Sequence, residues 1–502
     1  MLKFFLHSLI AFPFIILLSC SSTTQNSGEA PPSNTQPNVL FIAVDDLNDW
    51  LGCMDGHPNA KTPNMDKLAS EGVLFTNAHC QAPLCGPSRA SLMTGLRPST
   101  TGIYGMIDDD LIRTDNQTTS DIIYLPEYFQ QQGYYTMGIG KLFHQHAPEG
   151  LFDESGGRSR GFGPVPDHRF VWDGFAPEDK EIYGRTSTDW GAYPTQDSLM
   201  PDHQSAQWVR ERLTRNYDQP FFLAVGFLRP HVPLYVPQKW FDLHPIEGIE
   251  LPPYLPDDLE DVPAIAREQI NDLPMMPSTE WAIETGRWAD IVQAYLACVS
   301  FVDHQVGEVM QALNESKYAD NTIIVLWSDH GYRMGEKGTF AKHCLWQEAT
   351  NAPLMFSGPG VPAGKVIDVP VEMLSIYPTL LDLSELPAYD RNEGISLLPL
   401  MNGAQNDQKN KAITTFGWQN HTVVADQFRY TQYEDNSQEL YDHQQDPNEW
   451  NNLAATNEMN DREDAMRQLL PQENALWHPH SSYTFQPYFV EQKERVNQEP
   501  EN

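Results

Sequence analysis

The 502-residue chain is poor in basic residues and in cysteine. It has 32 Lys and Arg against 68 Asp and Glu, so its formal net charge is −36. Nucleic-acid binding needs a basic surface for the phosphates, and this composition argues against it. The six cysteines include no Cys-x-x-Cys pair that would suggest a zinc site. Hydrophobic residues make up 40% and charged residues 20%, which is ordinary for a globular protein with a large core.

Residues 1–20 have the features of an export signal. A positive Lys3 precedes an apolar run that is too short to span a membrane. The run ends in Leu-Leu-Ser-Cys, which resembles a bacterial lipobox and implies that Cys20 is lipidated. The protein would then be an exported periplasmic or outer-membrane lipoprotein that touches the membrane only through this anchor; an ordinary signal peptide is the alternative. Residues 21–37 are polar and Pro-rich and predict a disordered tether.

The middle of the chain alternates apolar runs with helix signals. The runs at 38–44, 221–227 and 322–328 predict buried strands of a mostly parallel sheet. A long helix pattern occupies 285–316. The alternation predicts an α/β catalytic domain over 38–410, with a large mixed sheet flanked by helices.

One helix start carries a nucleophile. The segment from Cys85 to Gly95 reads CGPSRASLMTG. Pro87 suits the first turn of a helix and Gly95 its end, so Cys85 lies at a helix N-terminus, where backbone N–H groups favour an anion. Arg89 lies about one turn away and offers a planar fork for an oxyanion. A buried free thiol is the plain alternative for such a cysteine.

This segment closely resembles the signature of the type I sulfatases, C-x-P-S-R followed by A-S-L-x-T-G. In that family the cysteine is converted to formylglycine, whose hydrated aldehyde is the nucleophile. The resemblance implies the same modification of Cys85, a formylglycine-generating maturation enzyme as a partner, and an alkaline-phosphatase-like fold.

Two pairs of potential ligands follow predicted strands. Asp45 and Asp46 follow one strand, and Asp329 and His330 follow another. Ligands bind at the carboxyl edge of such sheets, and abutting carboxylates favour a hard divalent cation. A solvated turn is the alternative for the Asp pair. The resemblance implies one divalent ion, Ca²⁺, held by these four residues and by residue 85; histidine is unusual for calcium, which leaves the identity of the ion open.

Basic residues and histidines follow two other strands. Lys141 and His144 come after the strand predicted at 134–139, with His146 as a competitor for the histidine role. Their Lys-x-x-His spacing resembles the iduronate-2-sulfatase branch. The resemblance implies that Lys141 contacts the sulfate and His144 the formylglycine. Taken alone, both would be surface residues.

The segment Arg229-Pro230-His231-Val232-Pro233 resembles the K-P-H-x-P segment of the same branch, with arginine in place of lysine. The resemblance places His231 and Lys342 on the leaving-group side of the sulfate. Arg229 and the long insertion at 147–195 are candidates for sugar contact. Without the resemblance, His231 would be a packed loop residue.

The pattern changes near residue 411. Short alternating stretches predict a small antiparallel sheet in a C-terminal subdomain over 411–485, with a helix near 461–476. Residues 486–502 are expected to form a polar tail. Export permits disulfides, but no spacing selects a pairing among the remaining cysteines, which are Cys53, Cys80, Cys298 and Cys344.

The resemblance implies a hydrolase of sulfated oligo- or polysaccharides, acting on a uronic-acid 2-sulfate or on another glycosaminoglycan or algal sulfate. In the implied reaction formylglycine attacks sulfur, a protonated His231 with Lys342 protonates the leaving oxygen, and His144 assists sulfate release. Alternatives are a phosphoester hydrolase of the same superfamily, with Ser or Thr and two metals, and a non-catalytic carbohydrate-binding surface lipoprotein. A protein of charge −36 needs a locally positive pocket for such a substrate, and a salty habitat would weaken its self-repulsion.

Overall fold

A computed structural model describes residues 36–167, 169, 188–404, 410–456 and 460–498. The expected export signal with Cys20, and nearly all of the expected tether, lie outside the described residues. None of the described helices has the length and apolar character needed to cross a membrane.

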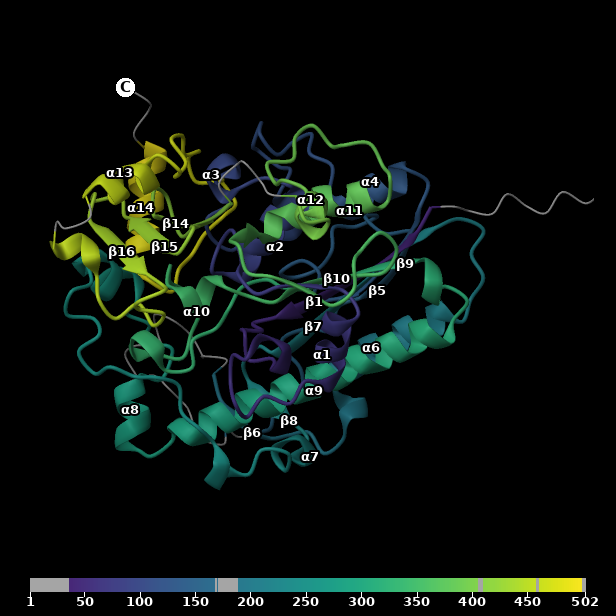
Figure 1. Ribbon diagram of the computed structural model, residues 1–502, viewed down its shortest axis with the longest axis horizontal. Helices are drawn as coiled ribbons and strands as arrows, with labels where there is room; N and C mark the ends of the chain where they lie inside the picture. Colours follow the sequence, from purple (N-terminus) through teal and green to yellow (C-terminus); the bar gives the residue numbers. More distant parts are fainter. Residues whose placement is uncertain (1–35, 168, 170–187, 405–409, 457–459, 499–502) are drawn as a thin grey trace, which may run out of the picture. The chain divides into compact units, whose positions relative to one another are not determined.

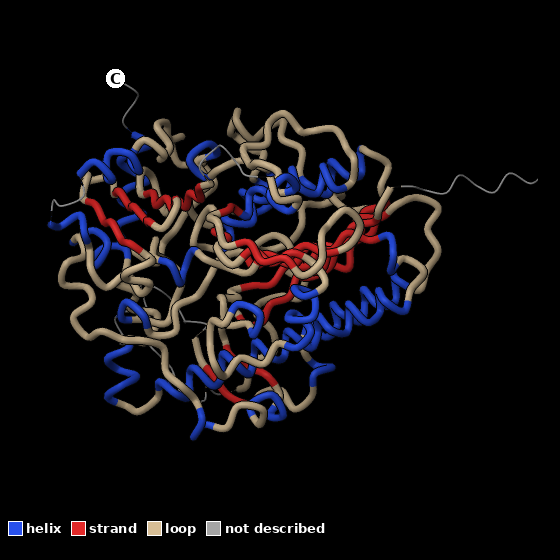
Figure 2. The backbone as a smooth tube through the Cα atoms, in the orientation of Figure 1, coloured by secondary structure: helices blue, strands red, loops and turns tan. Residues whose placement is uncertain are grey.

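An eight-stranded mixed sheet forms the centre of this part of the chain (Figure 2). The strand order is β11-β2-β10-β9-β1-β7-β4-β5. β10 runs antiparallel to β9 and β2, and the other neighbours are parallel, which confirms the predicted mostly parallel sheet. The strands are β1 Asn38–Asp45, β2 Val73–Phe75, β4 Tyr135–Gly140, β5 Glu154–Gly157, β7 Phe221–Pro230, β9 Thr322–Ser328, β10 Leu354–Ser357 and β11 Lys365–Ile367.

Helices cover both faces of this sheet (Figure 1). Along β1, Leu40 and Ile42 join one buried cluster, whereas Val39 and Phe41 join the other, because successive strand side chains point to opposite faces. The first cluster is covered by α1 Pro63–Ser70, α6 Pro201–Leu213 and α9 Trp288–Glu315. The second is covered by α2 Cys85–Thr94, α4 Leu125–Gln131 and α11 Ile376–Leu383.

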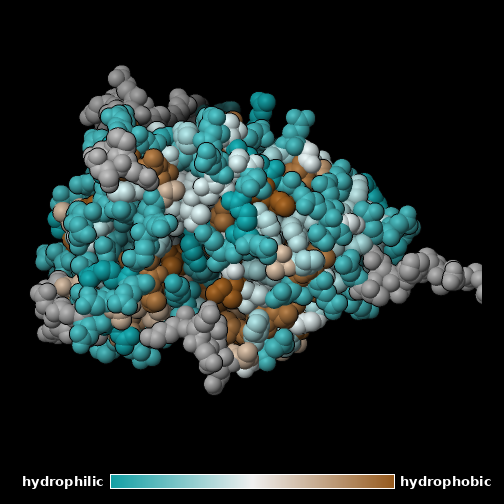
Figure 3. Space-filling model, turned by 90° about the horizontal axis from the view of Figure 1, so that it is seen from above, coloured by the Kyte–Doolittle hydropathy of each residue, from teal (hydrophilic) through white to brown (hydrophobic). Residues whose placement is uncertain are grey.

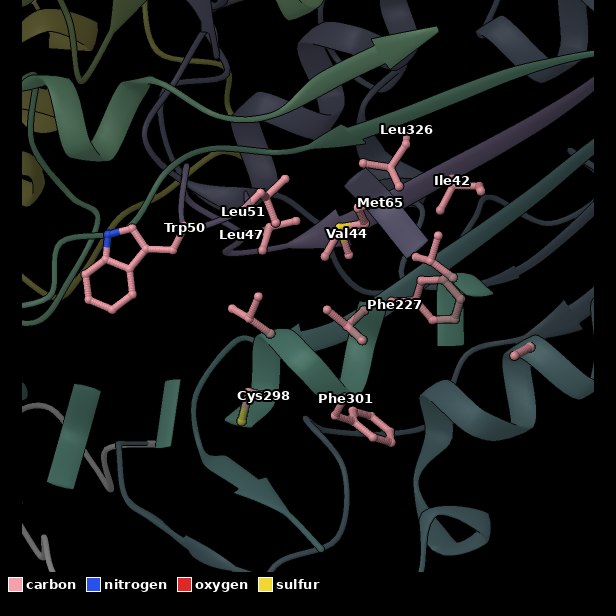
Figure 4. Packing of buried hydrophobic residues seen from close by; sticks show 14 of the residues in the cluster. Ile42, Val44, Leu47, Trp50, Leu51, Met65, Phe227, Cys298, Phe301 and Leu326 are labelled. Carbon is pink, nitrogen blue, oxygen red and sulfur yellow. The ribbon is translucent and has the colours of Figure 1, made fainter. Parts of the chain in front are cut away.

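The long helix α9 supplies much of the first cluster. In Figure 4 its Phe301 and Cys298 lie on the side of the cluster opposite Val44 of β1, with Phe227 of β7 between the two layers. Burying both faces of β1 in this way explains why its sequence is a continuous apolar run rather than an alternating one. The outer surface is mostly hydrophilic on the face seen in Figure 3, as the acidic composition requires.

Shorter elements connect the layers. The helices are α3 Pro98–Thr101, α7 Gln238–Phe241, α8 Thr279–Glu284, α10 Gln347–Thr350 and α12 Leu398–Met401, with a π-helix at Ile265–Ile270. Two-stranded sheets pair β3 Ala78–His79 with β12 Val371–Glu372, and β6 Trp190–Ala192 with β8 Leu234–Val236. The four cysteines left unassigned by the sequence, Cys53, Cys80, Cys298 and Cys344, are all free thiols.

The predicted C-terminal antiparallel sheet is present. It consists of β13 Lys411–Thr415, β14 His421–Ala425, β15 Phe428–Gln432 and β16 Gln438–Asp442. Helix α13, Asn460–Arg467, is shorter than the helix expected near 461–476.

The expected polar tail at 486–502 differs from the structure. Helix α14 spans Pro487–Gln498, and its Phe489 and Val496 are buried. The two apolar residues lie seven positions apart, hence on one helix face, and the polar residues between them concealed this face in the sequence.

Glu449 ties the small sheet to the main domain. Its fully buried carboxylate accepts hydrogen bonds from Arg429 Nε at 2.5 Å, His443 Nε2 at 2.7 Å and the Gln347 backbone N at 2.9 Å. Burial alone would raise the pKa of Glu449, but the charges of Arg429 and His443 hold the pKa at about 2.

We expect Glu449→Gln to lower the free energy of unfolding by about 3 kcal/mol at neutral pH, because it leaves the buried charge of Arg429 without a counter-charge. The folded pKa of Glu449 lies below its unfolded value, so its contribution is complete above about pH 4.5 and is lost as the pH falls toward 2. Denaturant titrations over this pH range should show the deficit shrinking. The matched control Asp464→Asn breaks a surface pair with Arg467 and should change stability by less than about 1 kcal/mol; a pH-independent deficit for Glu449→Gln would contradict the assignment.

Candidate active site

The helix that carries Cys85 is buried throughout. Helix α2 begins at Cys85 itself, and Gly95 ends it with φ of 76°, as the sequence predicts. Gly86 is required by close packing, because a Cβ there would lie 2.9 Å from the sulfur of Met106. Cys85 is 1% exposed. The helix therefore fixes the thiol at the edge of the main sheet.

The ends of β1 and β9 bring the two predicted ligand pairs together. These strands are parallel neighbours with Val44 paired to Ser328, so the two ligand pairs leave the sheet side by side, and the Asp46 backbone N donates to Asp329 Oδ1 at 3.1 Å. Asp46 turns the chain with φ of 61°, a conformation that Asp tolerates. The expectation that the two segments share one sheet edge is met by this geometry.

His330 aims one ring nitrogen at Cys85. Its Nε2 lies 3.3 Å from Cys85 Sγ, 3.4 Å from Asp46 Oδ1 and 3.7 Å from Asp329 Oδ2. Its Nδ1 lies 2.9 Å from the Gly331 carbonyl oxygen, so we place the proton on Nδ1. Nε2 faces the carboxylates, and although burial opposes it, the charges of Asp329, Cys85 and Asp46 raise the pKa of His330 to about 9. A bound cation would therefore replace a proton on Nε2.

Three buried cations face the three buried carboxylates. Arg89 Nε donates to Asp329 Oδ2 at 2.8 Å, and its Nη2 lies 3.3 Å from Asp45 Oδ1. Lys141 pairs with Asp45. Lys342 Nζ lies 2.7 Å from both oxygens of Asp46. All six residues are at most 4% exposed.

The role predicted for Arg89 needs correction. We expected its fork to bind an oxyanion of the substrate. In the structure the guanidinium contacts the carboxylates of Asp329 and Asp45 and the carbonyl oxygens of Lys141 and Leu142. Arg89 therefore holds the ligands in place. The sequence could not distinguish these oxygens from those of a substrate.

Comparison with known proteins agrees with this geometry. The family model described as "Sulfatase" matches residues 37–386, and a model described as "N-sulphoglucosamine sulphohydrolase, C-terminal" matches residues 335–475. A protein of Formosa agariphila named "Sulfatase" is 61% identical over 486 residues, which cover 96% of this chain and 95% of that protein.

The chain belongs to the sulfatase family.

Other relatives agree with this assignment. Human iduronate 2-sulfatase is 32% identical over 413 residues, which cover 74% of this chain and 73% of that protein. A solved structure in complex with its substrate D-glucosamine-2-N,6-O-disulfate has a TM-score of 0.67 at 23% identity, covering 87% of this chain and 97% of that one. The phosphonate monoester hydrolase of Agrobacterium radiobacter has the same TM-score at 22% identity, covering 86% and 94%. At such identities the last two comparisons establish the fold alone, and they confirm the predicted alkaline-phosphatase-like class.

The sulfatase pocket includes His231 from the end of β7. Its Nδ1 lies 2.6 Å from the Val232 carbonyl oxygen, and its Nε2 lies 3.8 Å from Asp46 Oδ2. The ring stacks on Phe162 with centroids 4.1 Å apart, and Lys141 Nζ lies 5.0 Å from the same Phe162 ring. Phe162 belongs to the predicted insertion at 147–195, of which residues 168 and 170–187 lie outside the described part. No motif in the sequence pointed to this residue.

Arg229 lies behind His231. Its Nη1 donates to the carbonyl oxygens of Phe162 at 2.9 Å and His231 at 3.2 Å, and its Nε donates to Tyr235 O at 3.0 Å. Arg229 is fully buried. These bonds give Arg229 a positioning role for the His231 loop, and its contact with the sugar stays a prediction.

The structure separates the two candidate histidines after β4. His146 faces Asp110 at 2.9 Å on the surface, where both side chains are about half exposed. His144 is half-buried on the side of Lys141, and the loss of solvent around it together with the charge of Lys141 lowers its pKa to about 3. His144 is thus a neutral base at physiological pH, with an Nδ1 that has no hydrogen-bond partner among the described residues.

Tyr295 and Ser88 hydrogen-bond the backbone of the two segments that carry the predicted ligands. The Tyr295 hydroxyl of α9 donates to Asp46 O at 2.7 Å and accepts from Asn48 N at 2.9 Å. Ser88 Oγ donates to the carbonyl oxygen of Asp329. In the sequence, Tyr295 is marked only by its place in the helix pattern at 285–316, and helical periodicity indicates a buried face without indicating its polar contacts.

A divalent cation fits these donors. Potential ligand atoms of Asp45, Asp46, Cys85 and His231 lie within 4.8 Å of one another, as do those of Cys85, Asp329 and His330. Burial raises the pKa of Asp46 to about 7 although Lys342 opposes this, so the carboxyl group lacks sufficient positive charge around it. Carboxylates with one imidazole suit several divalent ions, and the geometry does not select calcium.

We expect the purified sulfatase to retain one divalent cation per chain, and Asp46→Asn to lose it. Elemental mass spectrometry after dialysis measures the content, and circular dichroism checks that the variant folds. Asp110→Asn is the matched control, because Asp110 belongs to an exposed group with Asp108 and His146 that also has metal-ligand spacing. Equal metal content in wild type and Asp46→Asn, or loss in Asp110→Asn alone, would contradict the assignment.

Proposed function

We propose that this sulfatase removes an O-sulfate group from a sulfated carbohydrate, with a formylglycine made from Cys85 as its nucleophile. The observation that carries the proposal is the position of Cys85 Sγ, which stands in for the formylglycine oxygen. It lies 3.3 Å from His330 Nε2 and 3.8 Å from Asp46 Oδ1, in the pocket that also contains Lys141 and Lys342. The likeness to iduronate 2-sulfatase favours a uronic-acid 2-sulfate among the candidate substrates.

The charge of the pocket supports an anionic substrate. The three carboxylates and three cations cancel, so a bound divalent cation leaves the pocket with a net positive charge. This local charge resolves the conflict between a sulfated substrate and a protein of net charge −36. A bound divalent cation would neutralise sulfate oxygens, and formylglycine at position 85 would supply the attacking hydroxyl.

Two lysines and one histidine of the pocket act on the sulfate oxygens and on the leaving oxygen. Lys141 and Lys342 supply positive charge for sulfate oxygens. His231 presents Nε2 to the leaving oxygen because its Nδ1 proton is held by Val232. Burial and the charge of Lys342 hold the pKa of His231 well below its usual value, so the ring is neutral in the free pocket. A protonated His231 therefore requires the negative charge of the bound sulfate ester.

Two other chemistries fit less well. A phosphoester hydrolase with two metals needs a second buried set of ligands, and the buried metal-capable groups found in the described chain all share Cys85. A non-catalytic carbohydrate-binding protein would not need Lys141, His144, His231 and Lys342 around one buried thiol. The likeness to a phosphonate monoester hydrolase extends only to the fold.

We also propose that the protein is exported as a lipoprotein anchored through Cys20 and matured by a formylglycine-generating enzyme. The N-terminal Leu-Leu-Ser-Cys and the Cys85 signature support this proposal. Cys20→Ser should move the protein from the membrane fraction to the soluble fraction of its bacterial host.

Mass spectrometry of the tryptic peptide Leu68–Arg89 tests the nucleophile. We expect an aldehyde in place of the thiol at position 85 after expression with a maturation enzyme. Cys80 lies in the same peptide and serves as the internal control, because it should stay a free thiol. An unmodified Cys85 in a protein that still releases sulfate would refute the proposal.

We expect His144→Ala to lower the turnover number for sulfate release by about 100- to 10,000-fold, the usual cost of removing a general base. His146→Ala is the matched control and should stay close to wild type, because that ring faces the surface. Steady-state assays on the best substrate from a panel of defined sulfated oligosaccharides measure both. A larger effect at His146 would show that the base has been misassigned.

A further inference from the structure

A C-terminal segment lies against the start of the nucleophile helix. Met106 packs on Gly86, next to Cys85. The carbonyl oxygen of Met106 accepts from Ser482 N at 2.8 Å, and Gly105 N donates to Ser481 Oγ at 2.9 Å. These bonds place Ser481 and Ser482, almost 400 positions after Cys85 in the chain, beside Met106, which contacts the residue next to Cys85.

Tyr483, the next residue in this segment, is buried among aromatic rings. Its ring centroid lies 5.6 Å from His343, 5.6 Å from Phe416 and 5.2 Å from Phe489. His343 directly follows Lys342 in the chain. Tyr483 therefore lies between the helix that carries Cys85 and the loop that carries Lys342.

Two polar atoms in this contact have no partner. The Tyr483 hydroxyl and His343 Nδ1 are both buried and make no hydrogen bond within the described residues. Tyr483 is 3% exposed and His343 is also 3% exposed. Folded proteins seldom bury polar groups unpaired, because this forfeits their hydration without replacement. Such groups at the rim of an active site are explained most simply by a ligand that completes their bonds.

The Tyr483 hydroxyl keeps its proton, and its ring packs against His343, the residue after Lys342. Burial raises the pKa of Tyr483 well above its usual value, and the charges of Lys342 and Cys85 act on it as well. The hydroxyl is therefore a neutral donor on the Lys342 side of the pocket. In the proposed reaction Lys342 binds the sulfate, and the sugar is joined to that sulfate through the leaving oxygen.

We infer that Tyr483, with His343 beside it, forms the sugar-contacting wall of the pocket, where the tyrosine hydroxyl donates a hydrogen bond to a ring substituent oxygen of the sulfated sugar. The inference rests on the proposed function and adds a specificity-determining residue to it. The rings of Phe485 and His343 stack on each other with centroids 6.3 Å apart, and the half-buried Phe485 offers this wall an apolar surface that a sugar ring can lie against.

A nearby tyrosine shows what a structural hydroxyl looks like in the same cluster. Tyr104 is also buried, but its hydroxyl donates to the Ala475 carbonyl oxygen at 2.8 Å. Removal of that hydroxyl deletes a bond within the fold. Removal of the Tyr483 hydroxyl deletes none, so Tyr483→Phe should fold with unchanged or increased thermal stability.

The test compares Tyr483→Phe with wild type on two probes. One is the sulfated disaccharide that the wild-type enzyme cleaves best in the panel, and the other is inorganic sulfate as a product inhibitor. We expect kcat/KM for the disaccharide to fall about two- to ten-fold through KM, the effect of one neutral hydrogen bond, while the inhibition constant for sulfate stays the same. Tyr104→Phe should lose thermal stability and keep both kinetic values.

The possible results separate the inference from the function beneath it. An unchanged kcat/KM for Tyr483→Phe, or an equal shift in sulfate inhibition, overturns the assignment of Tyr483 and leaves the sulfatase proposal intact. If the wild-type enzyme carries formylglycine yet releases no sulfate from any saccharide, the proposed substrate class fails, and the sugar wall fails with it.

Discussion

The active site depends on the compensation of buried charge at one edge of the main sheet. Asp45, Asp46 and Asp329 are removed from water, and isolated carboxylates in such surroundings would be strongly destabilising. Arg89 and two lysines approach them from three different segments. The buried helix α2 and the turn at Asp46 hold these six charged side chains in position.

This arrangement also explains how an acidic protein handles an anionic substrate. The charges of the pocket side chains cancel, so a bound divalent cation would give the pocket a net positive charge. The pocket would then attract a sulfate ester even though the protein as a whole is strongly negative. Burial strengthens that attraction because little water screens it. The outer residues Tyr295 and Ser88 hydrogen-bond backbone atoms of the turns after β1 and β9 and thereby keep the charged side chains in place.

Much of this centre follows from the sequence for a physical reason. Parallel strands end at one edge, so ligands placed directly after β1 and β9 had to meet there. The Pro and Gly positions around Cys85 located a helix for similarly local reasons. The partners of Arg89 and Arg229 could not be predicted, because a guanidinium binds carboxylates, carbonyl oxygens and sulfate alike. Phe162 and Tyr483 come from distant segments, and their place in the pocket exists only in the folded chain. Helix α14 was missed since only two apolar residues mark its buried face.

The central claim is that a bound cation converts a charge-balanced pocket into an anion site. Calorimetric titration of inorganic sulfate into the full-length protein, with the divalent cation bound and after its removal by a chelator, tests this claim most directly. We predict clear binding to the metal-loaded protein and a loss of at least about ten-fold in affinity without the metal. Equal affinity in the two states would show that the lysines suffice and would contradict the account.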